Sequence, residues 1–354
     1  MASTSIVVPT YCESENVPKL VEELVKHVKD FELIVVDDNS PDRTWLTSLE
    51  SMAKNGVRGI VVRRLNSKGL ATAVLLGIQV AKNEIVVVMD ADLQHPPSVV
   101  PRLVEVVAQG CDIAIASRYV EGGSVEGWSF VRKTISKGAI LLARLLLPQA
   151  RSVRDPVSGF FAIKRSLVLE VLEHLDPEGF KILLELLVKT RWRCVKEIPY
   201  SFGLRIHGKS KLGVGQILRY VKHLMKLCSW RPLRFAAVGL VGTVVNLASL
   251  MLLLPYLEVY ALASAIAIEL SIINNFVLHE AWTFSDRRTG SCIRRFVFFH
   301  FATIPAIAMQ YIVSNALYYT LSLHPALSQF AGIVLGFVLN YVLCELGVWK
   351  YRRS

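Results

Sequence analysis

Long apolar stretches constrain this chain more than any other feature, because they are too long and too poor in charge for an ordinary soluble domain. They occupy residues 233–257, 259–278, 296–321 and 326–349. Each approaches or exceeds the roughly 20 residues that a helix needs to cross the hydrocarbon core of a bilayer. Four such stretches in succession predict a four-helix transmembrane domain. The alternative, a deeply buried soluble helical domain, would keep more polar faces.

The polar and apolar parts of the chain meet near residue 230. Hydrophobic residues make up 53% of the 354 residues, and charged residues are frequent only as far as about Arg234. We therefore expect two domains, with residues 1–230 in water and residues 231–354 in the bilayer.

Basic residues near the ends of the predicted spans indicate how the chain is oriented. They precede the first span, fill the loop between the second and third, and follow the last: Arg231, Arg234, Arg287, Arg288, Arg294, Arg295, Lys350, Arg352 and Arg353. The loops around Glu258 and His324 contain no Lys or Arg. Basic loops stay on the cytoplasmic side, so both termini and the N-terminal domain are predicted to be cytoplasmic.

The net charge of +11 favours an anionic partner, which could be nucleic acid, an anionic membrane surface or a phosphorylated substrate. Nucleic acid is the least supported, because the sequence contains no recognisable binding module. The six cysteines show no C-x-x-C spacing. Neither a zinc site nor a disulfide framework is therefore expected, and a reduced cytosolic setting fits.

Short apolar runs alternate with amphipathic segments in the first part of the chain. We expect strands at residues 5–8, 33–36, 59–62, 84–89 and 113–116, and helices at residues 15–29 and 70–81. Repeated β-α-β units predict a parallel sheet with helices on both faces. Ligands of such sheets bind beyond the carboxyl ends of the strands.

Polar residues follow several of these strands. They are Tyr11 and Glu13, Asp37 and Asp38, Asp90, Asp92 and Gln94, and Arg118. Asp90, Asp92 and Gln94 offer the oxygen ligands of a hard divalent cation, which would neutralise a departing diphosphate. Alternatively, the two aspartates cap the next helix, whose Pro96 and Pro97 suit a first turn. The absence of G-x-G-x-x-G and G-x-x-x-x-G-K-[ST] disfavours dinucleotide binding and P-loop chemistry.

Several motifs resemble known families. VPTYCE (8–13), VVDDNS (35–40) and MDADLQHPP (89–97) resemble the inverting glycosyltransferase family 2, which implies a GT-A type, Rossmann-like mixed sheet. SRY (117–119), RK (132–133) with Ser136, DPVSGF (155–160) and HGKSKL (207–212) resemble the dolichol-phosphate mannose synthases within it. From Arg234 onward, Glu269, NNF (274–276) and WTF (282–284) resemble the GtrA-like membrane family, which is linked to polyprenyl-linked sugar metabolism.

The resemblance implies a GDP-mannose donor, a dolichyl or other polyprenyl phosphate acceptor, and Mg²⁺ or Mn²⁺ as cofactor. The residues that would hold the nucleoside are Pro9, Tyr11, Glu13, Val36 and Asp38. Asp90 and Ala91 would lie along the ribose and diphosphate, and Asp92 and Gln94, with Asp90, would bind the metal. One departure is ILLE (182–185), where the synthases often have a Q-M-E-M-like stretch; only Glu185 is kept.

A phosphate acceptor changes the chemistry that the site must provide. A phosphate monoester has a second pKa near ~6 and is largely dianionic at neutral pH, so we expect no obligatory general base. Two anions must instead approach each other beside fixed positive charge. The candidates are Arg118 and Arg132, with Ser136, for the lipid phosphate, and Arg205, Lys209 and more weakly Lys211 for the diphosphate.

Residues 130–147 and 217–227 are basic and amphipathic, which suits helices lying at the membrane surface. Ordinary amphipathic helices packed on the sheet are the alternative. Two functional alternatives also remain at this point. One is transfer of glucose from UDP-glucose to a polyprenyl phosphate, and the other is a non-catalytic carrier or flippase of lipid-linked sugar.

Overall fold

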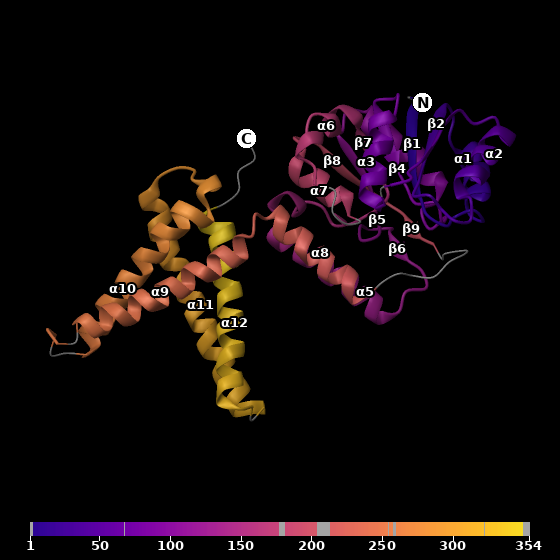
Figure 1. Cartoon of the computed structure of the whole chain (residues 1–354). Coiled ribbons are helices and arrows are strands. Elements are labelled where there is room, and N and C mark those ends of the chain that lie inside the picture. The colour runs from indigo at the N-terminus through magenta and orange to yellow at the C-terminus, as the bar shows by residue number, and fades with distance from the viewer. Residues whose placement is uncertain are drawn as a thin grey trace. The chain divides into compact units, whose positions relative to one another are not determined.

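The computed structural model describes residues 3–66, 68–176, 181–203, 213–253, 255–257, 260–321 and 323–349. The chain forms two compact units, Met1–Leu227 and Cys228–Ser354. Figure 1 shows an α/β unit and an all-helical unit, and each is described by itself below.

A seven-stranded sheet, in the order β3-β2-β1-β4-β7-β5-β8, forms the centre of the first unit. Its strands are β1 Thr4–Thr10, β2 Phe31–Asp37, β3 Gly59–Arg63, β4 Ile85–Val88, β5 Ile113–Ser117, β7 Phe161–Lys164 and β8 Val195–Pro199. In β1, Ile6 and Val8 belong to the core on one face of the sheet, whereas Val7 belongs to the core on the other. This alternation, with both faces buried, explains why the central strands read as continuous apolar runs.

The sheet is mixed, as the family resemblance implies, so the purely parallel sheet expected from the β-α-β pattern is wrong. β7 runs antiparallel between β4 and β5, with Val88 opposite Phe161 and Ile113 opposite Ile163. Residues just before an antiparallel strand lie at the same edge as residues just after its parallel neighbours. The segment 155–159 therefore reaches the edge where ligands are expected.

Helices cover both faces of the sheet. α1 Val17–His27, α2 Thr44–Lys54 and α4 Val100–Ala108 contribute to one core, and α3 Leu70–Val80, α6 Arg165–Leu169 and α7 Ile182–Lys189 contribute to the other. Gly77 lets α3 approach the sheet closely, because a Cβ there would lie 2.3 Å from Val7 Cγ1. This packing holds the start of α3 near the carboxyl end of β1.

Two further helices belong to this unit, α5 Phe130–Leu146 and α8 Val214–Leu227, together with a small parallel pair, β6 Ser124–Val125 and β9 Ser201–Phe202. The Ser129 side chain caps α5 by accepting a bond from the Arg132 main-chain nitrogen. The Tyr220 hydroxyl of α8 donates to the Ala139 carbonyl of α5 at 2.7 Å and ties the two helices together. Both present large apolar side chains to the outside, including Phe130 at 83% exposure and Leu218 at 65%.

The second unit consists mainly of four apolar helices, α9 Arg231–Leu253, α10 Tyr260–Leu278, α11 Cys292–Leu321 and α12 Pro325–Leu343. In the described part of the chain, three helical segments are long and apolar enough to cross a membrane: Arg231–Leu253, Cys292–Met309 and Ala331–Val348. The sequence predicts four spans, but α10 is not among these three.

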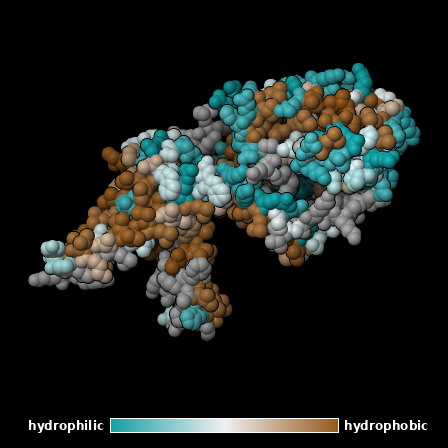
Figure 2. Space-filling view, viewed as in Figure 1, coloured by the Kyte–Doolittle hydropathy of each residue, from teal (hydrophilic) through white to brown (hydrophobic). Residues whose placement is uncertain are grey.

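Apolar side chains cover the outer surface of this helical unit (Figure 2). Leu240 of α9 is 71% exposed and Phe301 of α11 is 65% exposed. Apolar surface of this extent is typical of contact with lipid rather than with water. The polar Asn275 of α10 packs against α9, since a Cβ at Gly242 of α9 would lie 2.2 Å from the Asn275 amide oxygen.

Ion pairs connect the segment that follows α10 with the start of α9, with α11 and with the segment that follows α12. Arg231 pairs with Asp286 at 2.6 Å, Arg295 pairs with Glu280 at 2.5 Å, and Arg287 pairs with the buried Glu345. Several of the basic residues that indicate orientation are thus also structural. Lys350, Arg352 and Arg353 lie outside the described residues.

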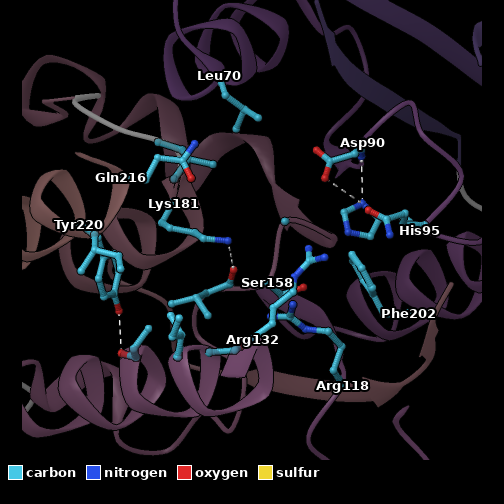
Figure 3. Close-up of a pocket in the computed structure, with 18 of the residues that line it drawn as sticks. Leu70, Asp90, His95, Arg118, Arg132, Ser158, Lys181, Phe202, Gln216 and Tyr220 are labelled. Carbon is cyan, nitrogen blue, oxygen red and sulfur yellow. Dashed lines mark hydrogen bonds and ion pairs between the residues drawn. The ribbon is translucent and has the colours of Figure 1, made fainter. Parts of the chain in front are cut away.

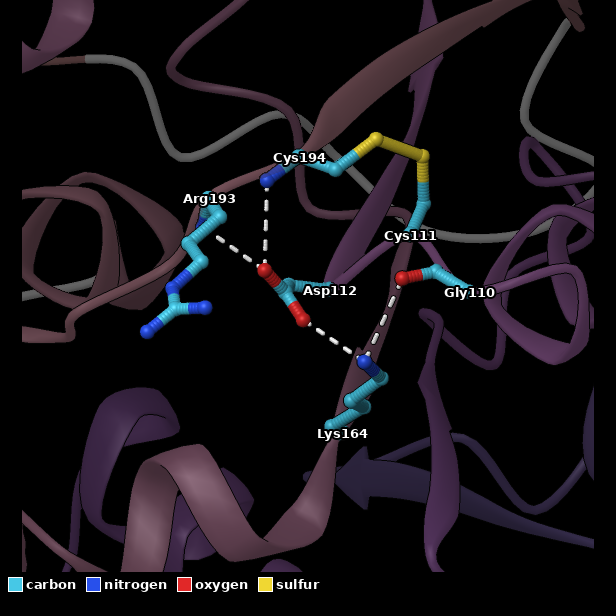
Figure 4. Close-up of a disulfide and its surroundings, with 6 residues drawn as sticks. All are labelled: Gly110, Cys111, Asp112, Lys164, Arg193 and Cys194. Atoms are coloured by element: carbon cyan, nitrogen blue, oxygen red, sulfur yellow. Dashed lines mark hydrogen bonds and ion pairs between the residues drawn. A yellow bond between two sulfur atoms is a disulfide. The ribbon is translucent and has the colours of Figure 1, made fainter.

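A disulfide joins Cys111 to Cys194 (Figure 4). The expectation of no disulfide is wrong. The two cysteines are 83 residues apart in sequence, so their spacing does not reveal the pair, and only the sheet brings them together. β5 and β8 pair in parallel with Ile113 opposite Val195, which places the residues before each strand side by side. The Asp112 carboxylate reinforces this corner by accepting from the Arg193 main-chain nitrogen at 2.6 Å and from Lys164 Nζ at 2.7 Å.

Replacing both bridged cysteines by serine should lower the free energy of unfolding by about 2–5 kcal/mol, because the bridge closes a long loop in the unfolded chain. Thermal unfolding of the full-length protein would measure the loss, with C292S, at an exposed free cysteine, as the control. Dithiothreitol should lower the stability of the wild type to that of the double variant. Equal stability of wild type and double variant without reductant would contradict the prediction.

Candidate active site

A cavity of about 510 Å³ lies at the carboxyl ends of β1 and β4 and is bordered by α5, α7 and α8. A volume of this size suits a small ligand or part of a larger one. The predicted site residues that line it are Pro9, Asp90, Gln94, Arg118, Arg132 and Ser136. Acidic and basic residues that are far apart in the sequence therefore face one space (Figure 3).

The acidic motif forms a tight turn after β4. Leu93 has a left-handed backbone (φ 61°), a conformation that costs an ordinary residue about 1 kcal/mol or more. The turn lets Asp92 Oδ1 accept from the Gln94 main-chain nitrogen at 3.2 Å. The Gln94 side chain donates to the Gly203 carbonyl at 2.9 Å. Asp92 and Gln94 are both buried, so these predicted oxygen ligands are held on a rigid turn.

The alternative in which the aspartates cap the next helix is wrong. In the described residues, the short 3₁₀ turn Pro97–Val99 and α4 after it begin without a side-chain cap. The prolines do occupy the first turns, as the sequence predicts.

His95 is a residue of this site that the sequence reasoning did not single out. Its side chain is buried, stacks on Phe160 with ring centroids 5.0 Å apart, and accepts a bond from the Asp90 main-chain nitrogen at 3.0 Å. Burial lowers the pKa of His95 to about 4, so the imidazole is neutral at physiological pH. Gly159 makes room for it, since a Cβ there would lie 3.3 Å from His95 Cε1. The histidine thus orients the main chain at Asp90.

The buried His95 should make the protein less stable in mild acid. Above about pH 6.5 the imidazole is neutral in both the folded and unfolded states; as the pH falls toward 4, only the unfolded chain takes up the proton. The resulting loss of unfolding free energy between pH 7 and pH 5 is about 2 kcal/mol. Urea unfolding of the full-length protein in detergent should show this loss in the wild type but not in H95N, whose amide oxygen still accepts from Asp90. An equal loss in both proteins would contradict the assignment.

Arg118 is a buried member of an ion pair, so the alternative of a solvated surface charge is wrong for it. It follows β5, and its Nε and Nη2 donate to the two carboxylate oxygens of Asp155, each at 2.8 Å. Burial alone would lower the pKa of Arg118, but the hydrogen bonds and charge of Asp155 outweigh it and raise that pKa. A guanidinium has five N–H donors, so a fork held by Asp155 keeps others for a ligand.

Arg132 and Ser136 lie one helical turn apart on α5, on the same face. The Arg132 guanidinium carbon lies 4.1 Å from the ring centroid of Trp128, and the Tyr119 hydroxyl donates to Ser136 Oγ at 2.9 Å. Trp128 also lies 5.6 Å from the Arg118 guanidinium. The aromatic ring thus connects the two predicted phosphate-binding arginines, and sequence reasoning did not identify it.

The residues predicted to hold a nucleoside lie at the ends of β1 and β2, and most of them do not line the cavity. The Asp38 carboxylate accepts from Arg64 Nε and from the Gly69 main-chain nitrogen, each at 2.7 Å. Lys68 Nζ lies 5.5 Å from the Tyr11 ring centroid. The side chains of Val36 and Ala91 are buried in the core, so only their main-chain groups are placed to contact a ligand.

Of the remaining predicted residues, the structure describes Glu13 and Asp37 but not the three basic residues of the HGKSKL region. Glu13 accepts a bond from the Asn16 amide at 2.6 Å, and Asp37 is fully buried and accepts bonds from Thr10 and Ser40. Asp37 is therefore structural. The predicted basic residues Arg205, Lys209 and Lys211 lie outside the described residues.

The acidic motif fits a divalent cation bound together with a diphosphate. In the described part of the chain, no three His, Cys, Asp or Glu side chains converge on one metal position. A small hard cation that keeps water and substrate phosphates as ligands needs only one or two carboxylates from the protein. Asp92, Asp90 and the Gln94 amide oxygen would provide such a set.

Comparison with known proteins agrees with this geometry. Residues 5–172 match glycosyl transferase family 2, and residues 234–349 match the GtrA/DPMS transmembrane domain. A dolichol-phosphate mannosyltransferase from Pyrococcus furiosus is 43% identical over 352 residues, which cover 98% of this chain and 99% of the relative. Proteins of the same name from Mycosarcoma maydis and Saccharomyces cerevisiae are 34% and 36% identical over 71% and 63% of this chain, and over 86% of each relative.

These two matches define a glycosyltransferase that carries a membrane domain. The mixed sheet and the acidic turn beside a basic cavity agree with this class. The likeness extends over nearly the whole chain, including both units. The chain belongs to the dolichol-phosphate mannosyltransferase family.

Proposed function

We propose that the chain transfers mannose from GDP-mannose to dolichyl phosphate, or to a related polyprenyl phosphate, with inversion at the anomeric carbon. The products are dolichyl phosphate mannose and GDP. Family membership supports the reaction. The observation that carries it is one cavity in which Asp90 and Gln94 of the acidic motif face the basic residues Arg118 and Arg132.

The donor would bind from the β1 and β2 ends to the acidic turn. In this proposal Pro9, Tyr11, Glu13, Val36 and Asp38 surround the nucleoside, and Asp90 and Ala91 lie along the ribose and diphosphate. Asp92 and Gln94, with Asp90, hold Mg²⁺ or Mn²⁺, which neutralises charge on the diphosphate when bound. Arg205, Lys209 and Lys211 add positive charge to the donor side.

The acceptor phosphate would bind between Arg118 and Arg132, with Ser136 as a further donor. Arginine forks suit phosphate oxygens. The neighbouring wall of the cavity is apolar and comes from α5 and α8, including Ile135, Leu142 and Ile217, which suits the first isoprene units of the lipid. The acceptor is already ionised at neutral pH, so the site needs to position it and requires no general base.

We further infer that residues 1–230 lie on the cytoplasmic face and that residues 231–354 cross the bilayer four times, with α10 as the fourth span. The basic residues before α9 and between α10 and α11 support this orientation. Helices α5 and α8 would lie at the membrane surface, because they expose apolar side chains next to basic ones.

Transfer of radiolabel to lipid tests the proposed reaction. Purified full-length protein is incubated with dolichyl phosphate, with labelled GDP-mannose or UDP-glucose, and with Mg²⁺, Mn²⁺ or EDTA. We expect lipid-extractable label from GDP-mannose that EDTA abolishes. Lipid label from UDP-glucose alone would mean that the donor is UDP-glucose and that the transferred sugar is glucose. No lipid label from either donor would contradict the proposal and favour a carrier.

A further inference from the structure

Lys181 lines the same cavity as the two predicted phosphate-binding arginines, although no motif of the sequence pointed to it. It is the residue immediately before α7. Its ammonium donates to the Val157 carbonyl at 2.9 Å, in the segment that leads into β7. Figure 3 shows its side chain reaching into the cavity, with Arg118 and Arg132 entering the same space.

A buried glutamate in α7, the helix that follows Lys181, holds this helix in place through hydrogen bonds. Glu185, the one residue of the ILLE stretch that matches the synthases, is buried and accepts from the Asp176 main-chain nitrogen at 2.6 Å. It also accepts from Lys189 Nζ at 2.8 Å. Glu185 therefore fixes the start of α7, which in turn fixes where Lys181 enters the cavity.

The charges around Lys181 indicate what it binds. Burial, and then the positive charge of Arg118, lower the pKa of Lys181 to about 8, and Arg132 acts in the same direction. Asp155 and Asp90 act in the opposite direction, but Asp155 is already paired with Arg118. Cations gathered at one cavity repel each other until an anion binds among them.

We propose that Lys181 binds the phosphate of the lipid acceptor together with Arg118 and Arg132. This inference rests on the proposed function. A lysine ammonium has three N–H donors, so its bond to Val157 orients the group and is compatible with a phosphate contact. The acceptor is favoured over the donor diphosphate because Lys181 is affected more strongly by Arg118, a proposed ligand of the acceptor phosphate, than by Asp90 on the donor side. The apolar wall from α5 and α8 lines the same cavity.

Removing the charge of Lys181 should weaken binding of the acceptor and leave binding of the nucleotide unchanged. K181M keeps the apolar stem of the side chain, and K181R keeps the charge. We expect K181M to raise the KM for dolichyl phosphate about 10- to 100-fold, the value of one charge-assisted hydrogen bond, with the Kd for GDP changed less than about twofold. K196M, at an exposed position on β8, is the matched control and should behave as wild type.

The pH dependence gives a readout that a merely structural lysine would not provide. As the pH rises above about 8, Lys181 in the free wild-type enzyme loses its proton, so the KM for dolichyl phosphate should rise. K181R should not show this rise, because arginine stays charged. Among the described residues, the other charged or titratable groups that act on Lys181 or line its cavity include Asp90, His95, Arg118, Arg132, Asp155 and Tyr220. All of these remain in K181R.

Direct binding separates this inference from the proposed reaction. Wild type and K181M in detergent are titrated with dolichyl phosphate, or with dolichol as the lipid that lacks the phosphate, and binding is measured by thermophoresis with no donor present. Weaker phosphate-dependent binding by K181M, with unchanged thermal unfolding, supports the inference even if no sugar is transferred. Equal binding by wild type and K181M, or a loss of GDP affinity in place of acceptor affinity, would overturn it.

Discussion

Replacing Asp92 by asparagine should lower the rate of lipid-linked mannose formation by about 10³-fold or more. Asparagine keeps the oxygen that accepts from the Gln94 main-chain nitrogen, so the turn should persist. The substitution removes one negative charge from the proposed metal site. Losing a few kcal/mol of stabilisation of the departing diphosphate corresponds to a rate loss of this size.

The measurement is initial transfer from GDP-mannose at saturating acceptor, over a range of Mn²⁺ concentrations. D30N is the matched control, because it makes the same substitution at an exposed aspartate that does not line the cavity. We expect D30N to retain wild-type activity. Wild-type rates from D92N at every Mn²⁺ concentration would show that the Asp92 carboxylate has no part in the reaction.

Replacing Arg118 by alanine should have two effects, which the structure allows to be separated. The buried Asp155 carboxylate would lose its bidentate partner, and removing one member of a buried pair costs about 3–5 kcal/mol of stability. Transfer should also be abolished, because Arg118 is one of the proposed ligands of the acceptor phosphate. GDP binding should change little in the folded fraction.

The double variant R118M/D155N distinguishes the two effects. It removes both charges of the buried pair. The asparagine at residue 155 still accepts a hydrogen bond from the main-chain nitrogen of residue 118, so most of the lost stability should return. Transfer should stay at least about 10²-fold below wild type, since the phosphate ligand is still missing. A stable double variant with normal transfer would assign Arg118 a purely structural role. Loss of GDP binding together with transfer would count against the acceptor assignment.

The sequence predicted the elements with strong local signals. Continuous β-branched runs predicted β1, β2 and the other strands of the β-α-β units, because strands buried on both faces need apolar residues throughout. The apolar stretches likewise predicted the helices of the second unit. Motif likeness predicted the family, and the roles of individual residues remain predictions.

Contacts between distant residues were beyond the reach of the sequence. β7 is short, and its antiparallel direction depends on its place between β4 and β5. That direction brings Asp155 to Arg118 and Gly159 to His95. The register of β5 and β8 likewise brings Cys111 to Cys194.

The sequence by itself therefore determined the strands of the β-α-β units, several helices and the apolar segments, because hydrophobic periodicity and length are local properties of the chain. It did not predict β7, β8 or α7. It also supplied the acidic motif and most of the candidate residues. Only the tertiary structure decided that Arg118 is a buried member of an ion pair, that His95 is neutral and that Lys181 shares the cavity. Burial and electrostatic environment arise from residues that are distant in the chain, and the sheet order determines which of them meet.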